Sequence, residues 1–90
     1  MKIKTTAENG HLRVYLYNSA DLKIITLYDN DEKDVMLMPN TAYTMEYHYW
    51  SPNPAKYSII SDPPFDEYPD GIVFDLPAAA EDDNIIDITT

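Results

Sequence analysis

Apolar and polar residues alternate along several short stretches of the 90-residue chain, most regularly between residues 43 and 50. In that stretch Tyr43, Met45, Tyr47 and Tyr49 fall on one side, and polar or amphipathic residues separate them. Successive side chains of a β-strand point to opposite faces of the sheet. The period of two therefore predicts a half-buried strand that ends near Trp50.

Six further stretches show similar alternation, or short apolar runs between turn residues, and are expected to be strands. They are residues 3–5, 11–17, 22–28, 35–38, 56–61 and 72–76. No amphipathic helix or internal repeat accompanies them. The pattern predicts an all-β domain over residues 1–77, a small antiparallel β-sandwich of about six or seven strands.

The last thirteen residues, 78–90, carry Glu81, Asp82 and Asp83 in succession. We expect them to form an exposed acidic tail. The alternative is a terminal strand built from the IIDI sequence at 85–88, within this chain or added to the sheet edge of a partner.

The residues that lead into the aromatic strand have the form L-x-P-x-T-x-Y, from Leu37 through Pro39 to Tyr43. This motif resembles the corner before a late strand of fibronectin type III domains, whose sandwich is immunoglobulin-like. The resemblance implies that Leu37 fills the core, Pro39 shapes the turn, and the hydroxyl of Tyr43 bonds to the upstream backbone. A simple proline turn before a tyrosine-rich strand is the alternative.

Charge is the most unusual property of the composition. Sixteen acidic residues stand against six basic ones, for a formal net charge of −10, and no basic residue follows Lys56. A field of this sign repels nucleic acids and anionic membranes and attracts basic proteins. We therefore expect a basic protein partner and no direct binding of nucleic acid or membrane.

Several classes of protein are disfavoured by what the chain contains. Hydrophobic residues make up 44%, enough for one modest core, and there is no cysteine. Disulfides and thiolate metal sites are thus excluded. Neither a signal peptide nor an apolar run long enough to span a membrane is visible, so a cytoplasmic location is expected, although a domain taken from a longer chain would look the same.

No motif for catalysis or for a cofactor is found. The two glycines, Gly10 and Gly71, cannot form a phosphate-binding loop, and no serine has the setting of a nucleophile. His11 and His48 would need a carboxylate such as Glu46 between them to bind a metal ion. We expect a protein without enzymatic activity, cofactor or metal site.

The charged segment that contains Asp29, Asp31 and Asp34 offers carboxylate oxygens, which calcium prefers. It lacks the EF-hand pattern, because Lys33 and Asp34 stand where a ligand and the required glycine belong. A solvated turn is the favoured interpretation, and calcium binding by another geometry is the alternative.

The aromatic residues are too numerous to be buried together in so small a domain. Tyrosine and tryptophan are enriched in binding hot spots, and three aromatic residues stand at a strand end or in a proline-rich loop beside acidic residues. The predicted partner-binding residues are Trp50, Phe65, Asp66, Glu67, Tyr68, Asp70, Glu81, Asp82 and Asp83.

The favoured function is therefore a non-catalytic protein-binding module that presents an acidic surface to a basic partner. Two main alternatives remain, and the aromatic residues also leave a carbohydrate-binding sandwich open. The first is an inhibitor that mimics nucleic acid, as in phage anti-defence proteins, antitoxins or immunity proteins, although the acids stand mainly in loops and in the tail. The second is a structural sandwich module of an adhesin or virion.

Overall fold

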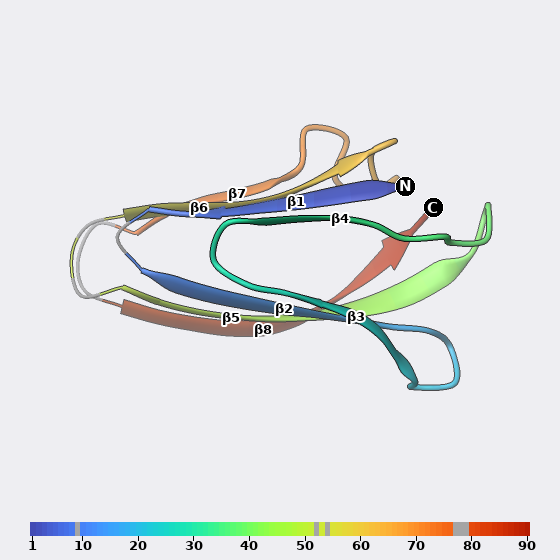
Figure 1. Ribbon diagram of the computed structural model, residues 1–90, viewed down its shortest axis with the longest axis horizontal. Coiled ribbons are helices and arrows are strands. Elements are labelled where there is room, and N and C mark those ends of the chain that lie inside the picture. The colour runs from blue at the N-terminus through green and yellow to red at the C-terminus, as the bar shows by residue number, and fades with distance from the viewer. Residues whose placement is uncertain (9, 52, 54, 77–79) are drawn as a thin grey trace.

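The computed structural model describes residues 1–8, 10–51, 53, 55–76 and 80–90, and they form two packed antiparallel sheets (Figure 1). The first sheet has the order β4-β1-β6-β7 and the second the order β3-β2-β5-β8. The strands are β1 (Lys2–Ala7), β2 (His11–Tyr17), β3 (Lys23–Leu27), β4 (Asp31–Asp34), β5 (Ala42–Ser51), β6 (Ala55–Asp62), β7 (Ile72–Leu76) and β8 (Ala80–Thr89). The described residues include no helix that could cross a membrane.

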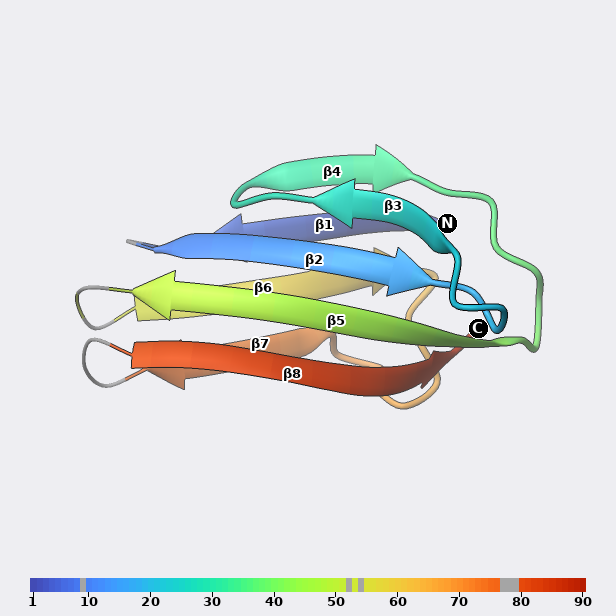
Figure 2. The same ribbon diagram turned by 90° about the horizontal axis from the view of Figure 1, so that it is seen from below.

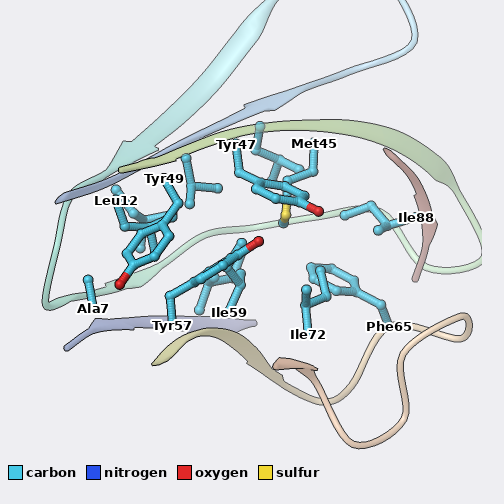
Figure 3. Close-up of a cluster of buried hydrophobic side chains, with 14 of the residues drawn as sticks. Ala7, Leu12, Met45, Tyr47, Tyr49, Tyr57, Ile59, Phe65, Ile72 and Ile88 are labelled. Atoms are coloured by element: carbon cyan, nitrogen blue, oxygen red, sulfur yellow. The ribbon is translucent and has the colours of Figure 1, made fainter. Parts of the chain in front are cut away.

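The predicted all-β sandwich is confirmed, with eight strands among the described residues in place of the expected six or seven. Its core follows from the alternation in the sequence, since Tyr43, Met45, Tyr47 and Tyr49 of β5 are all buried. The rings of Tyr49 and Tyr57 stack between the sheets, with centroids 4.2 Å apart (Figure 3).

The chain consists of two similar halves, each folded back on itself. In residues 2–34 β1 pairs with β4 and β2 with β3, and in residues 42–89 β5 pairs with β8 and β6 with β7. The halves join through β1·β6 in the first sheet and β2·β5 in the second (Figure 2). All of these pairs are antiparallel, and β8 lies at the edge of the second sheet.

The corner before β5 contains the hydrogen bond that the sequence motif implies. The backbone N–H of Met38 donates to the hydroxyl oxygen of Tyr43 at 2.9 Å, and Leu37 packs against the core. Thr41 Oγ1 donates to the carbonyl of Pro39 at 2.9 Å. The strand that follows β5 lies in the opposite sheet, whereas the last two immunoglobulin strands share one. Kinship with fibronectin type III domains stays a prediction.

The strand expected at residues 35–38 is displaced in the structure, and this prediction was wrong. The strand is Asp31–Asp34, inside the segment that we expected to be a charged loop. Its register sets Glu32 opposite Lys4 and Asp34 opposite Lys2. Opposite charges across a strand pair stabilise the pairing, and charged residues are tolerated at an exposed sheet edge.

The segment expected to be an acidic tail forms a ten-residue strand in the structure, which corresponds to the alternative of a terminal strand within this chain. β8 pairs with β5 along its whole length, from Trp50↔Glu81 and its neighbours to Ala42↔Thr89. Ile88 is fully buried. The predicted domain boundary at residue 77 and the first two residues of the predicted tail, 78–79, lie outside the described residues.

Candidate functional site

Side chains from β2, β5 and β8 meet on the outer face of the second sheet. The register of these strands places His11, Trp50 and Glu81 in one row across the sheet. Arg13, His48 and Asp83 form the next row. Because the inward-facing residues of β2 and β5 fill the core, these alternate residues are left on the surface.

A shallow groove of about 570 Å³ runs over these two rows. Its lining combines aromatic, basic and acidic side chains from the three strands and from the segment that follows β3. The lining residues are His11, Leu12, Arg13, Tyr15, Tyr28, Asp29, His48, Tyr49, Trp50, Glu81 and Asp83.

Exposed aromatic rings form one part of the groove. The imidazole of His11 stacks on the indole of Trp50, with centroids 6.2 Å apart and planes 16° from parallel. The indole remains 45% exposed, and Tyr28 is 54% exposed beneath the guanidinium of Arg13. Large aromatic surfaces that stay accessible in this way are typical of binding sites.

Carboxylates hold the two histidines in place. His48 Nδ1 lies 2.8 Å from Asp83 Oδ1, and His48 Nε2 lies 3.7 Å from Glu46 Oε1. On the opposite wall Asp29 accepts the backbone N–H of Leu12 at 2.7 Å and approaches His11 Nδ1 at 3.4 Å. The contact of His48 with Asp83 therefore links β5 to β8, whereas Glu46 lies on the same strand as His48 and Asp29 lies between β3 and β4.

One long border of this face is the edge strand β8. The side chains of Glu81, Asp83, Ile85 and Asp87 alternate along it and point outward. Alternate residues of a strand lie about 7 Å apart, so Glu81 and Asp87 are separated by roughly 20 Å. We call the three carboxylates of Glu81, Asp83 and Asp87 the β8 acidic row.

Some of the predicted partner-binding residues lie at the two ends of β8. Trp50, Glu81 and Asp83 gather at the groove. Asp66 and Glu67 lie at the other end of the strand, where the backbone N–H of Asp66 donates to the carbonyl of Thr89 at 3.0 Å. Both acids are exposed near this end of β8, and Asp70 is exposed in the same loop.

Hydrogen bonds from Thr89 hold the carboxylate of Glu67. The backbone N–H and the hydroxyl of Thr89 each donate to it at 2.7 Å. The hydroxyl bond is the main reason that the pKa of Glu67 lies below its ordinary value.

Asp82 turns the other way, toward the interior. The hydroxyl of Tyr57 donates to its carboxylate and so links the two sheets. Burial, and then this hydrogen bond, raise the pKa of Tyr57 above the ordinary tyrosine value. Asp82 thus holds the sheets together and does not belong to the outward-facing acids.

Of the predicted aromatic contacts, Phe65 is buried and Tyr68 is partly buried. Phe65 is only 2% exposed, and Tyr68 packs against the core. The prediction missed this because a proline-rich loop with two aromatic residues gives no sign of folding back over the open end of a sandwich. A bond from the backbone N–H of Phe65 to Ser61 Oγ at 3.1 Å fixes the fold-back.

Residues that the sequence prediction left out also line the groove, chiefly His11, Arg13, Tyr15 and Tyr28. The sequence contained part of this information, because the alternation of residues 11–17 indicates that His11, Arg13 and Tyr15 face solvent. The missing information was the pairing of β2 with β5, which brings His11 beside Trp50.

The carboxylates of Asp29, just before β4, and of Asp31, at its start, are engaged within the chain. Asp31 accepts the backbone N–H groups of Tyr28 and Glu32, at 3.3 and 2.9 Å, and lies 3.8 Å from Lys33 Nζ. Across the part of the chain that the structure describes, no group of three or more histidines and acids is arranged to hold a metal ion. No protein-family model matches the chain, and neither a curated protein nor a solved structure does so.

Proposed function

We propose that the protein is a non-catalytic binding module that engages a basic protein partner through the acidic surface around β8. The observation that carries the proposal is the β8 acidic row beside the exposed ring of Trp50. An accessible aromatic residue beside a line of charges combines a hot-spot contact with electrostatic attraction.

The distribution of charge between the two outer faces supports this choice. On the first sheet the outer face of β1, β4 and β6 carries three lysines, Lys2, Lys4 and Lys56, and three acids, Glu32, Asp34 and Asp62. The register of β7 adds one acid, Asp75, opposite Lys56, so this face has a formal charge of −1. On the second sheet two bases face four acids, a net charge of −2. These residues are Arg13, Lys23, Glu46, Glu81, Asp83 and Asp87.

The lining of the groove also favours binding over catalysis. Among its described residues there is no serine, threonine, cysteine or lysine to serve as a nucleophile. His48, the residue best suited to proton transfer, has Asp83 at 2.8 Å from Nδ1 and Glu46 at 3.7 Å from Nε2.

The proposal is tested by capture of partners from lysate of the source cells, elution with a salt gradient and identification by mass spectrometry. The test variant is Glu81→Gln/Asp83→Asn/Asp87→Asn, which removes the row. We expect the partner to be basic, to be released by moderate salt, and to bind the variant at least about tenfold more weakly.

A matched control removes the same number of charges from the opposite face. The variant Glu32→Gln/Asp34→Asn/Asp62→Asn is expected to keep the affinity of the wild type. If both variants bind alike, or if the captured partner is indifferent to salt, the proposal is wrong.

A second function, mimicry of nucleic acid, is favoured by one observation. In the β8 acidic row Glu81 and Asp83 lie about 7 Å apart and Asp87 about 14 Å farther along the strand. Glu46 stands opposite Ile85, the apolar residue between Asp83 and Asp87. Carboxylates in this arrangement could replace successive phosphates. If the captured partner is a nucleic-acid enzyme that duplex DNA or RNA displaces from the protein, mimicry is the better description.

A further inference from the structure

We propose that β8 accepts an additional β-strand from the basic partner, so that recognition extends the second sheet beyond its edge. This inference rests on the proposed function and adds its mode: an extended segment with Lys or Arg at alternate positions, paired antiparallel to β8. Strand addition of this kind takes its affinity from main-chain hydrogen bonds and its specificity from alternate side chains.

The four sheet edges are unequal, and this inequality singles out β8. The edges at β3, β4 and β7 are five, four and five residues long, whereas β8 has ten residues. β3 is also interrupted by a shift of register beside Tyr17. Short or irregular edges are the usual protection against unwanted pairing. β8 is long and regular, and no strand lies beyond it in Figure 2.

The backbone of β8 presents its odd-numbered residues to this edge. The N–H of Thr90 donates to the carbonyl of Thr41, so even-numbered residues bond toward β5. Thr89 faces the other way, with its N–H bonded to Glu67 and its carbonyl to Asp66. In an antiparallel pair these directions alternate, so the N–H and C=O groups of 81, 83, 85 and 87 point away from the sheet.

Existing contacts limit where a strand can dock. The loop that carries Asp66 and Glu67 covers the edge at Thr89. The N–H of Ile85 donates to Oδ1 of the preceding Asn84 at 2.9 Å, and the same side-chain amide donates to the hydroxyl of Tyr47 at 3.2 Å. An added strand can displace that side chain, and the accessible edge therefore spans residues 81–87.

Side chains along the edge specify the added sequence. In antiparallel pairing, directly opposed residues share a face, and opposite charges there stabilise the pair. Asp87, Asp83 and Glu81 each favour a cation, and Ile85, 63% exposed, favours an apolar residue. From its N-terminus the added strand should have the pattern cation, x, apolar, x, cation, x, cation.

A second copy of this chain does not fit the edge. If two β8 strands pair antiparallel about residue 84, Glu81 lies opposite Asp87 of the other copy, and pairing about residue 83 sets Asp83 opposite Asp83. Like charges opposed across a strand pair are destabilising. The occupant is therefore a basic segment, and the protein alone is expected not to self-associate through β8.

The test uses a fluorescent peptide of sequence TKTITKTKT, which has the required pattern, and measures its affinity for the full chain by anisotropy. The reversed sequence, TKTKTITKT, has the same composition and charge but the wrong order for antiparallel pairing. We expect the first peptide to bind at least about tenfold more tightly. Equal binding, or no binding of either peptide, would overturn strand addition.

Two substitutions at one position separate backbone pairing from charge. Ile85→Pro removes the outward N–H and keeps every acid, whereas Ile85→Thr keeps the N–H. Proline is tolerated at a sheet edge where the N–H faces solvent. We expect Ile85→Pro to weaken peptide binding about tenfold relative to Ile85→Thr. If both variants bind like the wild type while the triple variant of the acidic row loses binding, acidic capture stands and strand addition fails.

Hydrogen exchange tests the inference on the wild-type protein, so the result does not depend on whether a variant folds. In the wild-type complex the backbone amides of Asp83, Ile85 and Asp87 should exchange more slowly than in the free protein. Those of residues 84 and 86, already bonded to β5, should change little. Peptide binding without this alternation of protection would overturn the inference.

Discussion

The hydroxyl of Tyr43 ties the corner before β5 to the strand itself, because it accepts the N–H of Met38 at 2.9 Å. Tyr43→Phe removes the acceptor and leaves a partly buried donor without its partner. We expect a loss of about 1 kcal/mol in the free energy of unfolding, measured by urea denaturation. Tyr28→Phe, which removes a hydroxyl from an exposed ring, should change stability by less than about 0.5 kcal/mol. Equal effects of the two substitutions would contradict this account of the corner.

The L-x-P-x-T-x-Y motif predicted the local geometry of the corner, but it does not show that the chain is related to fibronectin type III domains. Leu37 and Tyr43 occupy the positions that the resemblance implies, yet the strand after β5 crosses to the other sheet. A corner needs only a turn and a tyrosine near its own upstream backbone. The same corner can therefore form in a chain whose strand order differs from that of fibronectin type III domains.

At the scale of the element, alternate residues of β8 have opposite roles. Ile88 is fully buried between the sheets, and Ile85 is 63% exposed on the outer face. Ile88→Ala should lower the free energy of unfolding by about 2–5 kcal/mol, since it removes core contacts and leaves a cavity. Ile85→Ala should stay within about 0.5 kcal/mol of the wild type. If β8 were a detached tail, both substitutions would be neutral.

The bond between Tyr57 and Asp82 gives the sandwich a dependence on alkaline pH. Because burial and this bond raise the pKa of Tyr57 in the folded state, folding stabilises the protonated phenol. The contribution is complete below the unfolded-state pKa of about 10 and falls as the pH rises above it. We expect stability measured by urea denaturation to decline above about pH 10.

A variant identifies the group that is responsible. Tyr57→Phe should make the alkaline decline shallower without removing it, because burial also raises the pKa of Tyr49. Asp82→Asn, which keeps a hydrogen-bond acceptor, should keep most of the decline. An unchanged pH profile in Tyr57→Phe would show that another group causes the loss.

Sequence patterns predict those strands whose own residues alternate between apolar and polar. They fail where a strand forms because of its pairing with a neighbouring strand. β5 and β2 were predicted because their inward residues are apolar at every second position. The sequence of β4, DEKD, contains no apolar residue, and the lysines of β1 determine its pairing. β8 was not the favoured prediction because its first half is acidic and its isoleucines come only in its second half.

The same reason explains how much of the candidate site could be predicted. Trp50 was named as an aromatic residue at a strand end, and Glu81 and Asp83 for their charge, but their meeting depends on the β5·β8 register. The pairing of His48 with Asp83 follows from that register as well. Composition can show that a chain has acids and aromatic residues to present. Only strand pairing shows which of them share a surface.

At the scale of the whole molecule, the net charge of −10 opposes compactness. Added salt shortens the Debye length and therefore screens the repulsion among the acidic residues. Raising NaCl from about 10 mM to about 0.5 M should stabilise the fold by on the order of 1 kcal/mol, seen as a higher melting temperature.

The triple variant of the β8 acidic row separates this effect from general stabilisation by salt. It should be more stable than the wild type in low salt and should respond less to added NaCl. A wild type that melts at the same temperature in both salt concentrations would show that the acids are too far apart to repel one another.

The pairing of first with last strands within each half has a consequence during synthesis. The half made of residues 2–34 can close early, because β1 finds β4 after a short length of chain. The second half cannot do so, since β5 is made well before β8. Until residues 80–89 have left the ribosome, β5 can pair on one side only, with β2. During that interval its open edge and its tyrosines are exposed to chaperones and to other nascent chains, and completion of β8 ends the exposure.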